Sequence, residues 1–181
     1  MSLDPALAQT FHAAATPPDG QTLYAVLDGA SIPDLLPKLH SGPRQFYSLL
    51  PGNLGKELAA AAPYVAELLP GADLTRWLIN EGWGQHWGIY AFSPAGILDV
   101  RKHFRGLFEV QDTQGKKFFF RYFDPRVFRA YLPTCTPAEL NTVFGSMDQY
   151  LMEDQDPAVL LRFRRKQGAL LRQEVRSSAP K

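Results

Sequence analysis

Two aspartates and one histidine are the residues best suited to acid–base chemistry: Asp28, His86 and Asp124. Histidine titrates near neutral pH and can act as a general base. Asp28 and Asp124 follow apolar segments that the pattern predicts as strands, and open α/β sheets bind ligands at strand ends. One hypothesis is therefore a small α/β hydrolase-like enzyme with a strand-end site around these three residues.

Each of these residues also has an ordinary structural role. Asp28-Gly29 and Asp124-Pro125 are common ways to turn a chain or to begin a helix, because a short carboxylate accepts hydrogen bonds from nearby backbone amides. We favour capping over catalysis for both aspartates and a structural role for His86. A network of Asp124 with Arg121 or Arg126 is a further structural interpretation.

Other catalytic patterns are missing from the sequence. His103 lies among basic residues, Cys135 is the single cysteine, and no His, Cys or carboxylate array has metal-ligand spacing. Gly82, Gly84 and Gly88 match neither a dinucleotide-binding nor a phosphate-loop pattern. We therefore expect no cofactor and no metal site.

All three tryptophans lie in an aromatic, glycine-rich block from Arg76 to Arg129. Trp77, Trp83 and Trp87 could form a platform for stacking a sugar or a base, but most tryptophans serve packing. The run from Lys117 to Phe123 is explained more simply as a strand between two layers. We expect most of these aromatic side chains to lie in a core.

The elements that would position these residues alternate between strand and helix patterns. Apolar segments predict strands, and stretches with capping residues and 3.6-residue periodicity predict helices. Expected strands include Thr22–Leu27, His86–Phe92 and a hairpin around Gly115, and an expected helix begins at Ser93-Pro94. The pattern favours an α/β fold with a mixed β-sheet flanked by helices, in which helical crossovers join parallel neighbours.

The C-terminal segment differs in charge from the rest of the chain. From Ala158 to Lys181 there are seven basic residues and one acidic residue, in a chain whose net charge is +1. We expect an α/β domain over residues 1–157 and a basic C-terminal helix or tail over residues 158–181. One short basic helix is weak support for nucleic-acid binding, so we expect a solvated or protein-docking helix and no nucleic-acid partner.

Composition places the chain among ordinary globular proteins. Apolar residues make up 45% and charged residues 20%, which is enough to build a core. The longest apolar runs are far shorter than the ~20 residues that span a bilayer. The N-terminus lacks the basic-then-apolar pattern of a signal peptide, and a lone cysteine excludes an internal disulfide. We expect a cytoplasmic location and no membrane partner.

Several motifs in order resemble the successive signatures of the type VI secretion adaptor family, also described as effector chaperones. The resemblance runs from about Leu23 to Phe144 and rests on Tyr24–Ala30, Ala62–Val65, Arg76–Leu78, Glu81–Gly84, Trp87–Ile89 and Phe120–Val127. It implies a non-enzymatic task. Such adaptors bind a toxic effector protein in the cytoplasm of the producing bacterium and help to load it onto the VgrG spike.

The resemblance also directs attention to residues that could bind these partners. Aromatic and arginine side chains are enriched at binding hot spots. We hypothesise that Trp83, Trp87, Arg121 and Arg126 form or support a groove. The expected C-terminal helix would add a second contact to the effector or the spike through Leu160, Phe163 and Arg164.

Overall fold

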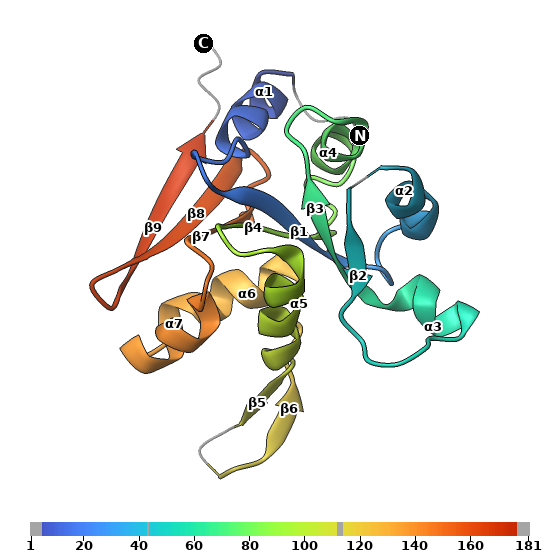
Figure 1. The fold of residues 1–181 in the computed structure, drawn as a ribbon. Helices are drawn as coiled ribbons and strands as arrows, with labels where there is room; N and C mark the ends of the chain where they lie inside the picture. Colours follow the sequence, from blue (N-terminus) through green and yellow to red (C-terminus); the bar gives the residue numbers. More distant parts are fainter. Residues whose placement is uncertain (1–4, 43, 112–113, 177–181) are drawn as a thin grey trace.

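A computed structural model describes residues 5–42, 44–111 and 114–176 of the chain. Its centre is a seven-stranded sheet with the order β2-β3-β1-β4-β7-β8-β9 (Figure 1). A separate two-stranded sheet joins β5 and β6. The strands are β1 (Thr22–Asp28), β2 (Phe46–Ser48), β3 (Pro63–Leu68), β4 (Gly88–Ser93), β5 (Glu109–Gln111), β6 (Lys117–Phe119), β7 (Gln149–Glu153), β8 (Val159–Lys166) and β9 (Ala169–Arg176).

Helices connect the strands and confirm the expected α/β class. They are α1 (Pro5–Ala14), α2 (Leu35–Ser41), α3 (Lys56–Ala61), α4 (Asp73–Asn80), α5 (Ile97–Gly106), α6 (Pro125–Tyr131), the 3₁₀ helix η1 (Leu132–Thr134) and α7 (Pro137–Phe144). The helix expected from Ser93 begins at Ile97, because the Ser93 hydroxyl accepts a hydrogen bond from the amide of Ala95 and stabilises a turn instead. Among the described residues, no helix is long and apolar enough to cross a membrane.

The strand pairings of the large sheet are antiparallel wherever the structure describes them. The parallel neighbours expected from the alternating pattern therefore do not form. The reason is the direction in which the chain crosses the sheet. The crossovers through α2, α4 and α5 to α7 return the chain so that each strand runs opposite to its sheet neighbours, as β4 does beside β1.

Both faces of the sheet are covered by helices, which gives a three-layer arrangement. Alternate residues of β1 point to opposite faces: Leu23, Ala25 and Leu27 pack with α1, α2 and α4, whereas Tyr24 and Val26 pack with α5, α6 and α7. We call these the α1 face and the α5 face. The almost unbroken apolar sequence of β1 follows from this double coverage.

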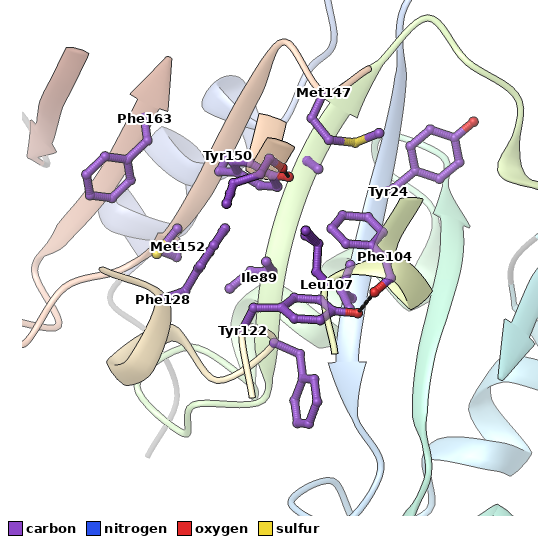
Figure 2. Packing of buried hydrophobic residues seen from close by; sticks show 14 of the residues in the cluster. Tyr24, Ile89, Phe104, Leu107, Tyr122, Phe128, Met147, Tyr150, Met152 and Phe163 are labelled. Atoms are coloured by element: carbon purple, nitrogen blue, oxygen red, sulfur yellow. Dashed lines mark hydrogen bonds between the residues drawn. The ribbon is translucent and has the colours of Figure 1, made fainter. Parts of the chain in front are cut away.

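The core on the α5 face is rich in aromatic side chains. The hydroxyl groups of its buried tyrosines donate hydrogen bonds to backbone carbonyl oxygens. Figure 2 shows Tyr122 beside Phe104, with the Tyr122 hydroxyl donating to the Phe104 carbonyl oxygen at 2.6 Å. The Tyr150 hydroxyl donates to the carbonyl oxygen of Val143 at 2.7 Å. Burial raises the pKa of both tyrosines well above the ordinary value, so they remain neutral donors.

The prediction of a basic C-terminal helix is wrong. Residues 159–176 form a β-hairpin, β8 and β9, in which the two strands pair along their whole length. Gln167 and Gly168 form the two-residue turn, and both have positive φ, 51° and 79°. Such turns match the twist of paired strands, and glycine adopts them without strain. β8 also pairs with β7, so the large sheet continues past residue 157.

Candidate functional site: a charged cluster at one end of the sheet

Three strands bring charged residues to the same end of the sheet. β1 ends at Asp28, β7 ends at Glu153, and β4, which lies between them and runs in the opposite direction, begins at Gly88. The segment from Phe120 to Asp124 and the first turns of α6 add arginines. Residues that are far apart in the sequence therefore meet here. Asp28 and Arg121, for example, are 93 residues apart and are joined by a hydrogen bond.

Asp28 is almost completely buried, with 3% of its surface exposed. Its carboxylate accepts hydrogen bonds from the Ala30 amide at 3.1 Å, from the Ser31 hydroxyl at 2.8 Å and from Nη2 of Arg121 at 2.8 Å. The local bonds confirm the expected turn-forming role. The ion pair with Arg121 joins the end of β1 to the segment that follows β6.

Asp124 caps α6, as the sequence predicts. Its carboxylate accepts a hydrogen bond from the Arg126 amide at 3.0 Å and a bidentate pair from the Arg126 side chain, Nε at 3.0 Å and Nη2 at 2.7 Å. Burial acts to raise the pKa of Asp124, but the hydrogen bonds and the positive charge of Arg126 outweigh it and hold this pKa below its ordinary value. The expected carboxylate–arginine network is confirmed.

Glu153 is the residue of this cluster that sequence reasoning missed. It is 4% exposed, and its carboxylate accepts hydrogen bonds from the amides of Gly84 at 2.5 Å and His86 at 3.1 Å. Its Oε1 atom also contacts Nδ1 of His86, and its carbonyl oxygen accepts a bond from Arg129 at 3.2 Å. No local pattern marks Glu153, because its partners lie 67 and 69 residues earlier.

The electrostatics of the cluster are those of a network that holds loops in place. Burial raises the pKa of Glu153, and the nearby His86 opposes that effect. The charges of Glu153 and Asp28 help to raise the pKa of Arg126, after the larger effect of Asp124. The three carboxylates therefore share one electrostatic environment, and each is held by donors from a different loop.

The hydrogen bonds and ion pairs of the carboxylates limit the acid–base chemistry that this cluster can perform. A general base needs a lone pair that faces a substrate. The oxygens of Asp28 and Asp124 already accept bonds from Arg121, Ser31 and Arg126. Across residues 5–42, 44–111 and 114–176, no group of three His, Cys, Asp or Glu side chains is arranged to hold a metal ion.

The three tryptophans do not form one platform. The Trp83 ring lies 3.7 Å from the Phe11 ring between centroids, and its Nε1 donates to the Pro157 carbonyl at 2.8 Å. Trp77 and Trp87 pack against each other at 4.8 Å. Trp83 is buried, whereas Trp87, which precedes β4, is only partly covered and packs on the α1-face core. The Trp87 carbonyl oxygen accepts a hydrogen bond from the Asp28 amide at 2.9 Å.

A family model described as a domain of unknown function, DUF4123, matches residues 23–142, about two thirds of the chain. The chain belongs to the DUF4123 family. No curated protein and no solved structure matches it. The DUF4123 span begins in β1, ends in α7 and contains Asp28, His86, Arg121 and Asp124, so most of the charged cluster belongs to the family domain.

The remaining predicted contact residues lie beyond the DUF4123 span, on β8. Leu160 is 2% exposed and Phe163 is fully buried, so both side chains belong to the core and are covered. Because β8 is a central strand of the C-terminal part of the sheet, its residues are apolar on both faces near its start. Arg164 is exposed, and its Nε donates to Oε1 of Gln149 at 2.7 Å.

Proposed function

We propose that this DUF4123 protein is a type VI secretion adaptor that binds a toxic effector protein in the cytoplasm and promotes its loading onto the VgrG spike. The observation that carries the proposal is the family match over residues 23–142. All but the last two residues of the resemblance described above, which runs from Leu23 to Phe144, fall within this span. In this proposal the protein acts by binding and has no catalytic role.

A projecting hairpin supports a role in protein binding. Figure 1 shows β5 and β6 extending away from the large sheet, beyond the end of α5. Phe118 is 44% exposed and Phe119 is 60% exposed, with Phe119 stacked on Phe108 at 5.1 Å. Exposed aromatic side chains on a projecting element are typical of contact sites, because they bury a large apolar area when a partner binds.

The charged cluster would then serve as the support for a second contact. Arg121 and Arg126 keep about half of their side-chain surface exposed, at 48% and 54%, while their carboxylate partners are buried. Trp87 lies at the same end of the sheet, where its carbonyl oxygen accepts a hydrogen bond from the Asp28 amide, and its side chain is partly exposed. We propose that these three residues contact the effector or the spike, and that Trp83 supports them from the core.

Co-expression with a candidate toxin and a VgrG protein from the same bacterium tests this function. We expect the toxin to co-purify with the wild-type chain. Replacing Phe118 and Phe119 with Ser would weaken the complex, whereas Leu98→Ser on α5, which is also 60% exposed, would leave it intact. Purification of the wild-type chain free of both proteins would contradict the proposal.

The alternative is a small hydrolase-like enzyme around Asp28, His86 and Asp124. The observation in its favour is the contact between His86 and the buried Glu153, since a histidine paired with a carboxylate can act as a base. Assays with generic ester and peptide substrates test it. Activity that is lost in His86→Ala while the fold is kept would favour the enzyme over the adaptor.

A further inference from the structure

The β8–β9 hairpin is part of the large sheet, and the side of the hairpin that lies on the α1 face is only partly covered. Leu160 and Val175 pack into the α1-face core, and Leu161, Phe163 and Leu170 pack into the α5-face core. Strand residues alternate between faces. The α1 side of the hairpin beyond Leu160 therefore carries six residues, which we call the basic hairpin face: Arg162, Arg164, Lys166, Ala169, Leu171 and Gln173.

The two sides of the hairpin differ in how their cations are balanced. On the α5 side, two of the three cations form ion pairs: Arg172 pairs with Glu174 at 3.0 Å, and Arg176 pairs with Glu174 and with Asp156. The third, Arg165, bonds the side-chain oxygen of Asn141. Within the described part of the chain, no cation of the basic hairpin face forms an ion pair with a carboxylate. Arg164 bonds the neutral amide of Gln149 instead.

Arg162 shows the effect of this imbalance. Its Nε atom is enclosed and has no hydrogen-bond partner among the described residues. Burial and the neighbouring charge of Arg164 lower the pKa of Arg162. Enclosed donors without a partner are uncommon in folded proteins, and like charges on one strand face repel each other. A negatively charged partner would relieve the repulsion.

The apolar part of this surface is Leu171, which is 48% exposed between the cations and lies opposite Arg164 in the strand pairing. Elsewhere the sheet carries helices on both faces, so an uncovered strand face is a place where a further helix can pack. We infer that the basic hairpin face binds an acidic amphipathic helix, with carboxylates against its three cations and an apolar side chain on Leu171. That this helix belongs to the effector rests on the proposed function.

A protein helix fits this surface better than a nucleic acid does. Strong nucleic-acid sites commonly make six or more phosphate contacts, roughly twice the number of cations available here. Single strands also stack their bases on aromatic side chains. The basic hairpin face offers a leucine at its centre and no aromatic residue.

A peptide titration tests the chemistry without a known partner. The isotope-labelled full chain is titrated with a synthetic helical peptide that has leucine at every third or fourth position and glutamate elsewhere. We expect amide shifts along β8 and β9, and binding that weakens with salt. Arg164→Glu with Lys166→Glu should weaken binding about tenfold or more, whereas Lys102→Glu with Arg105→Glu on α5 should not.

Three results would overturn the inference: no binding of the acidic peptide at low salt, equal loss in the α5 control, or tighter binding of a poly-dT oligonucleotide to the same amides. If the double variant fails to fold, Lys166→Glu alone remains a test, because Lys166 is exposed and forms no ion pair among the described residues. Its expected loss is about threefold.

The effector provides a second arm that separates this inference from the proposed function. If the wild-type chain captures the effector and the Arg164→Glu, Lys166→Glu variant captures it equally well, the adaptor function stands and the inference is overturned. If the wild-type chain captures no effector, the proposed function fails, and the peptide titration alone decides whether the face binds acidic helices.

Discussion

The Nδ1 atom of His86 contacts the Oε1 atom of Glu153 and joins the loop before β4 to the end of β7. His86 has a φ of 60°, a region that residues other than glycine adopt with strain. The same carboxylate binds the His86 and Gly84 amides. One buried side chain therefore holds a strained loop against the sheet.

The stability of the chain should depend on pH through Glu153. Burial raises its pKa, so the folded chain holds this proton more tightly than the unfolded chain does. The protonated Glu153 side chain makes its full contribution to the free energy of unfolding below its ordinary pKa of 4.5. This contribution is lost as the pH rises through the higher pKa of Glu153 in the folded chain. We expect the free energy of unfolding of the wild type, relative to Glu153→Gln, to fall from pH 4.5 toward neutrality. Urea denaturation over this range measures the difference, and a constant difference would contradict the prediction.

Substitutions at His86 should separate the contact from the backbone strain. His86→Ala loses the contact to Glu153 and keeps the strained backbone, whereas His86→Gly loses the contact and relieves the strain. We expect His86→Gly to be more stable than His86→Ala by about 1 kcal/mol. Thermal and urea denaturation of the two variants provide the comparison, and a less stable glycine variant would show that strain is unimportant here.

The cap of α6 should account for part of the stability of the cluster. Asp124→Asn keeps an acceptor for the Arg126 amide, and Asp124→Ala removes it. We expect Asp124→Ala to be less stable than Asp124→Asn by about 1 kcal/mol at neutral pH. Because the pKa of Asp124 is lowered, its charge stabilises the fold above its ordinary value of 3.8, and this is lost as the pH falls below it. Equal stability of the two variants would exclude a capping contribution.

Gly88 should be intolerant of any side chain. A Cβ atom at this position would overlap the backbone carbonyl oxygen of Val26 and crowd Leu27 on the neighbouring strand. Since backbone cannot move aside within the sheet, we expect Gly88→Ala to cost about 4 kcal/mol or more. Gly55→Ala is the control, because nothing lies within 4 Å of its Cβ position and its φ of −62° suits alanine. Similar melting temperatures for the two variants would refute this.

The sequence was sufficient for features that depend on neighbouring residues. Asp124-Pro125 predicted a helix start because capping involves residues two positions apart. The double coverage of Thr22–Leu27 was likewise evident from its unbroken apolar run. The burial of most aromatic residues of the Arg76–Arg129 block, such as Phe104 and Tyr122, followed from side-chain size. The expected strand between two layers over Lys117–Phe123 was wrong at Phe118 and Phe119, which are exposed on β6.

Features that depend on distant pairing were not accessible in this way. Leu160, Leu161, Leu170 and Leu171 fit a helical edge, and strand pairing with β7 overrode that preference. Gln167-Gly168 was the available hairpin signal, with Gly168 at the second turn position. The cluster was predicted in part, through Asp28, Arg121 and Arg126, but Glu153 was not, because it meets its partners only after the sheet has formed.

The strand order also determines when the sheet can be completed during synthesis. β1, β2, β3 and β4 pair with one another and all precede Pro94, whereas β7 joins β4 only after residue 149. Domains fold as the chain leaves the ribosome, from the N-terminus onward. A nascent chain can therefore assemble four strands early and must wait for Glu153 before the His86 loop is fixed. Ribosome-bound chains that stop short of β7 would leave the edge of β4 open to other strands.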